Sequence, residues 1–185
     1  MKQLAFYLKT DRCVGCFACV SACTNENRSR TSKAFRAVRN DLDSFYLSFS
    51  CHHCSSPECM RVCLKHAFSK RRDGAVVIDD SLCDGCGKCE AVCPFQMIRI
   101  ETTISGLKAK KCELCTDRRE NGQEPACVEA CTSGALLFGD MERAPLGSSA
   151  DWQTLAEAGI TRTYTDPSTR VTLPKPKIRY FLSDE

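Results

Sequence analysis

The residues of this sequence best suited to chemistry are its cysteines, which are numerous and closely spaced. Sixteen cysteines occur in 185 residues, far above ordinary usage. They form four motifs of four, numbered here one to four, and no cysteine lies outside them. The motifs are Cys13-x2-Cys16-x2-Cys19-x3-Cys23, Cys51-x2-Cys54-x4-Cys59-x3-Cys63, Cys83-x2-Cys86-x2-Cys89-x3-Cys93 and Cys112-x2-Cys115-x11-Cys127-x3-Cys131.

This spacing is typical of chains that bind [4Fe–4S] clusters through thiolates. Three cysteines two residues apart can wrap one corner of a cubane, and the fourth ligates a neighbouring cluster, as in two-cluster bacterial ferredoxins. We expect that fourth cysteine at the start of a helix. Gly15, Gly85 and Gly87 permit the dihedral angles that a curled loop needs. Four such motifs predict four [4Fe–4S] clusters and one-electron transfer.

Disulfides and zinc are the competing uses of so many cysteines. A disulfide framework suits a secreted chain, but we recognise no signal peptide, and cysteines two or three residues apart bridge poorly to one another. Structural zinc prefers two CxxC or CxxH pairs with a spacer between them, a pattern that only motif four approaches. Motifs one and three crowd three cysteines into seven residues, which disfavours a tetrahedral zinc site.

Other function classes find little support in the sequence. The formal charge of +3 is too small and dispersed for a nucleic-acid-binding protein. No apolar run of about 18 residues predicts a transmembrane segment. Dinucleotide, P-loop, zincin and nucleophile-elbow motifs are absent, so the chain is not expected to be an enzyme.

Basic and imidazole side chains accompany the cysteines. Four basic residues near motif four either compensate cluster charge or lie in a solvated loop: Lys110, Lys111, Arg118 and Arg119. Three histidines in or beside motif two are interpreted as surface or packing residues, with cluster tuning by one of them as the alternative: His52, His53 and His66.

The strand pattern predicts how the motifs pair. Residues 67–70 and 75–79 flank an Asp-Gly turn, which is a hairpin signal, so motifs two and three should form one two-cluster unit. Strands at 4–8 and 135–138 flank motifs one and four, and their pairing would close a second unit around the first. Further strands are predicted around the inner unit, at 45–49 and 97–100.

The predicted fold class is α+β, with two nested bacterial-ferredoxin-like units and a mostly irregular C-terminal tail. Residues 1–140 are predicted to form the tandem four-cluster domain, with an inner unit at 45–101 and an outer unit at 3–23 with 108–140. Residues 24–44 are polar and without periodicity, and we expect a linker or surface loop there.

Residues 141–185 form a predicted C-terminal extension for docking or partner contact. The cysteines stop and prolines become frequent. A short helix is expected at 151–158, ended by Gly159. The apolar end at 178–182 would cover this domain or contact a partner.

The sequence resembles a known family, the four-cluster electron-transfer subunits of dimethyl-sulfoxide-reductase-type molybdoenzymes. The likeness spans residues 3–140. It is carried by Cys51-His52-His53-Cys54, Cys83-Asp84-Gly85-Cys86-Gly87-Lys88-Cys89, Lys111-Cys112-Glu113-Leu114-Cys115, Arg118, Pro125-Ala126-Cys127-Val128 and Ala135 to Gly139-Asp140. The chain departs from the family where Leu64 follows Cys63 and Thr132 follows Cys131, positions at which proline is common.

The resemblance implies a set of four ligands for each cluster. The sets are Cys13, Cys16, Cys19 and Cys131 for cluster 1; Cys112, Cys115, Cys127 and Cys23 for cluster 2; Cys51, Cys54, Cys59 and Cys93 for cluster 3; and Cys83, Cys86, Cys89 and Cys63 for cluster 4.

The resemblance also implies partners. One is a molybdopterin-containing catalytic subunit, and a second redox partner is a quinone-binding membrane subunit or another carrier. The chain would be cytoplasmic, peripheral to a membrane through a partner, or exported with a partner that carries a signal. Two alternatives stay open: an electron-transfer subunit of a hydrogenase or formate dehydrogenase complex, and a free polyferredoxin.

Overall fold

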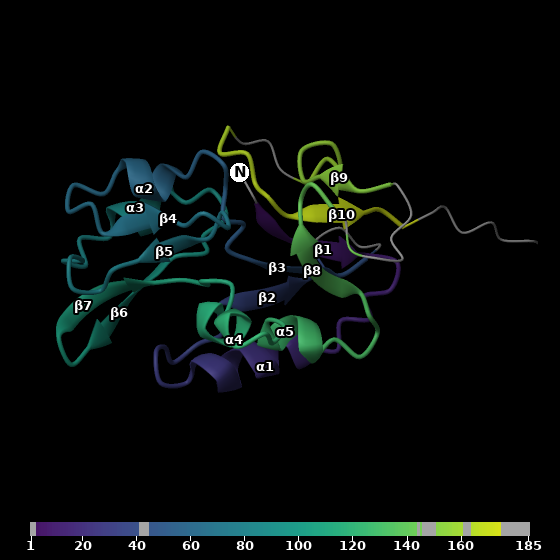
Figure 1. Ribbon diagram of the computed structural model, residues 1–185, viewed down its shortest axis with the longest axis horizontal. Coiled ribbons are helices and arrows are strands. Elements are labelled where there is room, and N and C mark those ends of the chain that lie inside the picture. Colours follow the sequence, from purple (N-terminus) through teal and green to yellow (C-terminus); the bar gives the residue numbers. More distant parts are fainter. Residues whose placement is uncertain (1–2, 41–44, 144, 146–150, 161–163, 175–185) are drawn as a thin grey trace, which may run out of the picture.

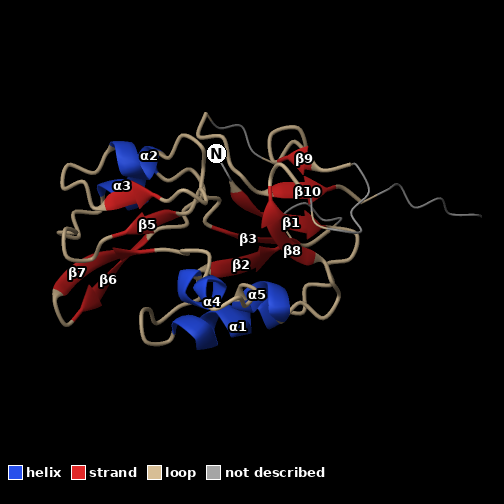
Figure 2. Ribbon diagram, viewed as in Figure 1, coloured by secondary structure: helices blue, strands red, loops and turns tan. Residues whose placement is uncertain are grey.

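The protein combines short helices with small sheets (Figures 1 and 2). The structure, a computed structural model, describes residues 3–40, 45–143, 145, 151–160 and 164–174. The helices are α1 (Ala18–Asn27), α2 (Glu58–Arg61), α3 (Lys88–Val92), α4 (Thr116–Glu120) and α5 (Ala126–Glu129). The strands are β1 (Leu4–Lys9), β2 (Arg36–Arg39), β3 (Leu47–Ser50), β4 (Phe68–Lys70), β5 (Val76–Ile78), β6 (Arg99–Thr103), β7 (Gly106–Lys110), β8 (Leu136–Asp140), β9 (Gln153–Thr154) and β10 (Arg170–Thr172). The prediction of an α+β fold is confirmed.

The largest sheet has the strand order β8-β1-β10-β9. Strand β1 is apolar and buried along nearly its whole length, and it pairs antiparallel with β8, Leu4 opposite Asp140 and Leu8 opposite Leu136. These are the strands expected before motif one and after motif four. The sheet therefore joins two segments that are more than a hundred residues apart in the chain.

The other strands form three two-stranded antiparallel sheets: β2-β3, β4-β5 and β6-β7. The β4-β5 hairpin is the one that the Asp73-Gly74 turn predicts. The Asp73 carboxylate accepts a 3.0 Å hydrogen bond from the Ala75 backbone N–H, and Gly74 has φ of +83°, which suits a turn of this kind. Local turn chemistry thus fixes the segment between motifs two and three.

Four of the five helices in the described residues pack in two pairs. Helix α1 packs against α5, and α2 packs against α3. In Figure 1 the second pair lies with β4 to β7 at one end of the molecule, and the first pair lies with the remaining strands at the other. Motif one is thereby adjacent to motif four, and motif two to motif three.

Three local predictions are wrong. Residues 24–44 are not simply a loop, because α1 continues to Asn27 and β2 pairs antiparallel with β3. No helix forms at 151–158, where Gln153–Thr154 is a strand that pairs with β10 and a turn follows. The fourth cysteine does not begin a helix: it lies inside α1 in motif one and at or just beyond the end of α2, α3 and α5 in the others.

The described part of the C-terminal extension packs on its own chain. Strand β10 lies parallel to β1, with Leu8 opposite Val171. Just before β10, the Ser168 backbone N–H donates a 3.1 Å hydrogen bond to the His52 carbonyl oxygen, and the Ser55 N–H donates to the Asp166 carbonyl at 2.8 Å. The extension therefore covers motif two, whereas the apolar end at 178–182 lies outside the described residues.

None of the helices in the described ranges has the length and apolarity that crossing a membrane requires.

Candidate metal centres

The four motifs share one local backbone feature. In each, the residue before the second cysteine has a positive φ: Gly15 (+66°), His53 (+45°), Gly85 (+70°) and Leu114 (+58°). This region is easily reached by glycine and uncommon for other residues. In each motif the third cysteine lies in a short helix and the fourth comes four residues later. The sequence repeat is thus a structural repeat, and all four motifs present their sulfur atoms from the same kind of loop and helix.

One cavity collects cysteines from motifs one and four. It has a volume of about 20 Å³, and the cysteines that line it are Cys13, Cys16, Cys19 and Cys131. Apolar side chains, among them Leu8, Val14 and Leu136, complete its wall. Burial raises the pKa of the Cys13 thiol, and the neighbouring thiols of motif one and motif four raise it further. The cavity coincides with the cysteine set expected for cluster 1.

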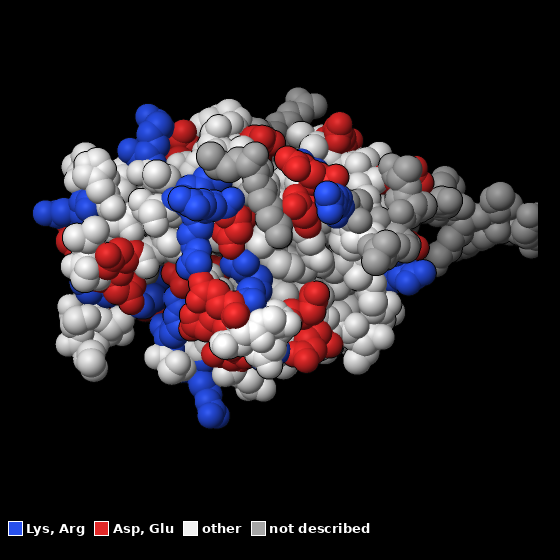
Figure 3. Space-filling model, in the orientation of Figure 1, with Lys and Arg blue, Asp and Glu red and all other residues white. Residues whose placement is uncertain are grey.

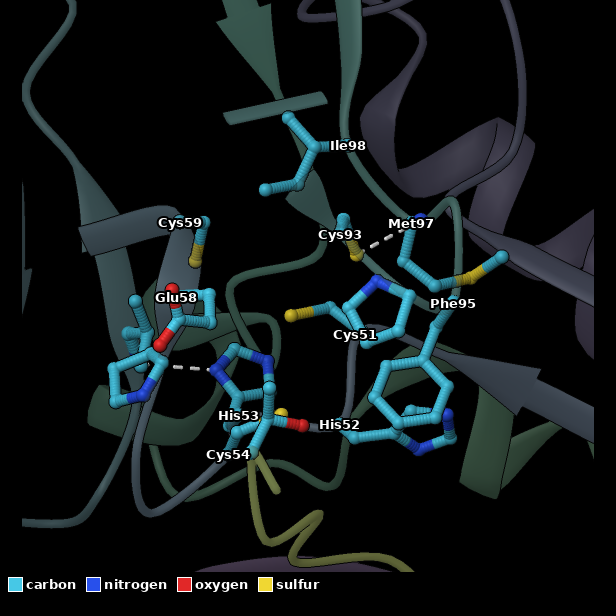
Figure 4. A pocket seen from close by; sticks show the side chains of 14 residues that line it. Cys51, His52, His53, Cys54, Glu58, Cys59, Cys93, Phe95, Met97 and Ile98 are labelled. Carbon is cyan, nitrogen blue, oxygen red and sulfur yellow. Dashed lines mark hydrogen bonds between the residues drawn. The ribbon is translucent and has the colours of Figure 1, made fainter. Parts of the chain in front are cut away.

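A second cavity, of about 30 Å³, collects cysteines from motifs two and three (Figure 4). The cysteines that line it are Cys51, Cys54, Cys59 and Cys93. Burial raises the pKa of Cys59 to about 12 and that of Cys54 to about 11, and the neighbouring thiols act in the same direction. These are the cysteines expected for cluster 3.

The cysteines expected for cluster 2 also lie near one another. Burial raises the pKa of Cys112, and the nearby thiols that add to this effect are Cys51, Cys115, Cys127 and Cys23. Burial likewise raises the pKa of Cys115 to about 11, and the thiols of Cys127 and Cys23 contribute to the rise. Because Cys51 belongs to the set of the second cavity, the two groups of cysteines are neighbours.

Among the cysteines expected for cluster 4, the three from motif three lie near one another, and Cys63 packs close to two of them. Burial raises the pKa of Cys89 to about 11, and Cys83 and Cys86 raise it further. Cys63, from motif two, packs against the apolar cluster that contains Cys83 and Cys89. Cys86 is exposed, as is Cys16 of motif one.

Most of the fourth cysteines accept a hydrogen bond from a backbone amide that follows them. The Ala67 N–H donates to Cys63 Sγ at 3.4 Å, the Met97 N–H to Cys93 Sγ at 3.5 Å and the Leu136 N–H to Cys131 Sγ at 3.3 Å. In motif one the helix continues past Cys23, and its sulfur receives the Asn27 side-chain amide at 3.7 Å, together with backbone N–H groups from Phe35 and Arg36. Such donors stabilise thiolate and favour a bound, negatively charged cluster.

An unpartnered group beside the second cavity tests whether a cluster fits there. The His53 side chain is 1% exposed, and its Nδ1 accepts a 2.9 Å hydrogen bond from the Val76 N–H. A neutral imidazole then carries its proton on Nε2, and this atom is buried without a protein partner. A buried donor of this kind needs an acceptor, which the sulfide of a [4Fe–4S] cluster would supply. Within the described residues no group of three or more His, Cys, Asp or Glu side chains could hold a single metal ion.

The basic residues near motif four are mostly paired. Lys110 forms an ion pair with Asp80, Arg118 pairs with two glutamates, and Arg119 pairs with Asp73 at 2.8 Å. Lys111 is buried and donates to two backbone carbonyls. On the face drawn in Figure 3, basic and acidic side chains are mixed. Three of these four cations therefore have carboxylate partners, and a purely solvated loop is the wrong interpretation for Lys111.

Sequence patterns left open the burial of His52 and His53 and missed that of Arg36. His52 and His53 are both buried, so packing, and not the surface, is the role that fits them. Burial lowers the pKa of His52 to about 3, which keeps it neutral. Arg36 is buried as well, in a segment taken for a linker. The stretch Phe35-Arg36-Ala37-Val38, with three apolar residues beside the arginine, is the one signal that could have indicated a strand here.

The chain matches known iron–sulfur proteins over most of its length. A family model described as a 4Fe-4S dicluster domain matches residues 42–141. The chain is 34% identical over 155 residues to the B component of anaerobic dimethyl sulfoxide reductase of Escherichia coli (strain K12), covering 76% of this chain and 75% of that protein. It is 37% identical over 152 residues to the B component of tetrathionate reductase of Salmonella typhimurium, covering 76% and 59%.

A further relative is named for electron transfer. The chain is 38% identical over 145 residues to the thiosulfate reductase electron transfer subunit PhsB of Salmonella typhi, covering 73% of this chain and 74% of that one. The matched model covers more than half of the chain and contains motifs two, three and four. The chain therefore belongs to the 4Fe-4S dicluster family, as a non-catalytic iron–sulfur electron-transfer subunit of the dimethyl-sulfoxide-reductase-type molybdoenzymes.

Proposed function

We propose that the chain relays single electrons through four [4Fe–4S] clusters, between a molybdopterin-containing catalytic subunit and a second redox partner. The ligands of each cluster are the four sets expected from the sequence. Bound clusters supply one-electron chemistry over a wide range of potentials. The observation that carries the proposal is that two cavities are each lined by four cysteines from two separate motifs.

The order of the centres along the relay follows from which cysteines are neighbours. Cys112 of the second set lies near Cys51 of the third, and the third and fourth sets exchange the last cysteines of motifs two and three. The order 1-2-3-4 results, with Cys16 and Cys86 exposed at its two ends. Electrons would enter and leave near these two cysteines, where a partner can approach most closely.

The protein matrix excludes water between the centres. Apolar side chains packed among the cysteines form one continuous cluster around motifs one and four and a second around motifs two and three. Buried surroundings and amide donors to sulfur are the means by which a protein adjusts cluster potentials. The chain thus holds the centres close and dry, and chemistry on the terminal substrate belongs to the catalytic partner.

Ligand exchange between motifs is tested with two substitutions on one helix. Cys19 and Cys23 both lie in α1, yet the proposal assigns them to different clusters. The test uses electron paramagnetic resonance of the chain purified without oxygen. Cys23→Ser should change the same cluster signal as Cys115→Ser. Cys19→Ser should change the same cluster signal as Cys131→Ser. If Cys19→Ser and Cys23→Ser change the same signal, the ligand assignment is wrong.

The identity of the partners is tested by native purification. The relatives serve different reductases by name, and the co-purifying partner would identify the one that this chain serves. We expect a larger chain that contains molybdenum and pterin to co-purify. A membrane subunit would place the complex at a membrane. A lone species of 20.5 kDa that carries clusters would instead favour a free polyferredoxin.

A further inference from the structure

Arg36 is a buried cation on β2. Only 3% of the Arg36 residue is exposed to solvent. Its Nη1 donates to Ser48 Oγ at 3.1 Å and its Nη2 to Ser50 Oγ at 3.2 Å, and its guanidinium carbon lies 4.3 Å from the centroid of the Phe6 ring. Among the described residues, no carboxylate forms an ion pair with it. A fully buried charge without a counter-charge is costly.

The groups that face this cation are cysteines of two different sets. The thiols of Cys127, Cys112 and Cys19 raise the pKa of Arg36 against the effect of burial. Cys127 and Cys112 belong to the set of cluster 2, and Cys19 to that of cluster 1. Arg36 therefore stands beside both, and thiolates bound to iron would provide the missing negative charge.

Ser48 links the guanidinium to one of these sulfur atoms. Its Oγ lies 3.4 Å from Cys19 Sγ, and it lines the cavity that contains Cys13, Cys16, Cys19 and Cys131. Arg36 occupies a lone pair of the hydroxyl oxygen, which leaves the hydroxyl proton free. A thiolate cannot donate, so the proton points from Ser48 to the sulfur and the chain of donors runs from Arg36 through Ser48 to Cys19.

We propose that Arg36 raises the reduction potentials of the two clusters of the outer unit, with Ser48 carrying part of its effect to Cys19. Reduction adds one negative charge to a cluster. A fixed cation in a buried site stabilises that charge more than the same cation would in water. The inference rests on the proposed function, because it requires clusters at these two cysteine sets.

The test is an anaerobic redox titration of the full-length chain, monitored by electron paramagnetic resonance. Arg36→Met keeps much of the side-chain volume and removes the charge. It should lower the midpoint potentials of clusters 1 and 2, each by about 59 mV or more. This corresponds to a change of about tenfold or more in the one-electron reduction equilibrium. Arg36→Lys keeps the charge, so both midpoint potentials should stay close to their wild-type values.

Ser48→Ala separates the two routes. It breaks the link to Cys19 and leaves the cation in place, so it should lower only the potential of the signal that Cys131→Ser assigns to cluster 1. Arg39→Met is the matched control on the same strand. Its side chain is exposed, where solvent screens a charge, and we expect no change in any potential.

The outcomes separate the inference from the function beneath it. Wild-type chain without four clusters would remove the proposed function. If Arg36→Met keeps the wild-type iron content and its potentials are unchanged, the inference is overturned and the proposed function still stands. If Arg36→Met does not fold, Arg36→Gln, which also removes the charge but keeps a polar side chain, decides: lowered potentials of clusters 1 and 2 support the inference, and unchanged ones overturn it.

Discussion

The Val76 backbone N–H donates a 2.9 Å hydrogen bond to Nδ1 of His53, and this contact decides which ring nitrogen carries the proton. With Nδ1 as acceptor, a neutral ring is protonated at Nε2. Burial, with cations nearby, lowers the pKa of His53 well below its usual value, so the ring is neutral. Strand β5 thereby orients a hydrogen-bond donor beside the cavity of Cys51, Cys54 and Cys59 (Figure 4).

His53→Asn should therefore lower the potential of the cluster held by that cavity. Asparagine tolerates the positive φ at this position but is too short to place a donor where Nε2 lies. The expected loss is about threefold to tenfold in the one-electron equilibrium, about 30–60 mV, in a redox titration. His66→Asn is the matched control, since His66 also has a positive φ and is exposed. Equal shifts in both variants would contradict the role given to Nε2.

Asn27 is predicted to add a side-chain donor to the Cys23 sulfur, beside the backbone N–H groups of Phe35 and Arg36. Asn27→Leu removes the only side-chain amide that contacts this sulfur among the described residues. We expect the potential of the cluster 2 signal to fall, by about 30–60 mV, and the remaining three to stay. Asn25→Leu, on the exposed side of α1, is the control. An unchanged cluster 2 signal in Asn27→Leu would mean that the contact has no electronic effect.

Two glycines of motif three should differ sharply in their tolerance of alanine. Both have a positive φ, which costs an alanine about 1–2 kcal/mol. At Gly85 a Cβ would also overlap the Leu107 carbonyl oxygen and lie 2.5 Å from the Leu107 Cβ, whereas at Gly87 it would meet nothing within 4 Å. Gly85→Ala should lose about four iron atoms per chain, and Gly87→Ala should keep them. Equal iron content in the two purified variants would show that β7 yields to the clash.

The C-terminal extension is predicted to protect the cluster bound by motif two. Thr165 lines the second cavity, and Thr169 Oγ1 lies 2.7 Å from Nδ1 of His52. A chain that ends at residue 164 should lose iron in air faster than one that ends at Pro174, which keeps these contacts and β10. The decay of visible absorbance measures this loss. Identical decay rates in the two truncated chains would mean that the extension has no protective role.

The cysteine spacing predicted the chemistry because ligand positions are a local property of the loop. The same holds for the β4-β5 hairpin, where the Asp73-Gly74 turn carries its own signal. The β1-β8 pairing was also predictable, since both strands are apolar and flank related motifs. These features depend on residues that lie near one another in sequence or that repeat.

The features that sequence patterns missed depend on contacts between distant segments. Arg36 is charged, so hydrophobic periodicity cannot indicate that it is buried. Residues 151–158 have helical composition, but Gln153–Thr154 finds a partner in β10, and tertiary pairing overrides a weak local preference. The burial of His53 depends on β5, twenty-three residues later in the chain.

The most direct test of the account is the metal and sulfide content of the full-length chain, purified without oxygen. Four clusters predict about 16 iron atoms and about 16 inorganic sulfides per chain, with no zinc. Removal of the iron should unfold most of the chain, because cluster binding supplies folding energy. Zinc in place of iron, or an iron content near four, would contradict the account.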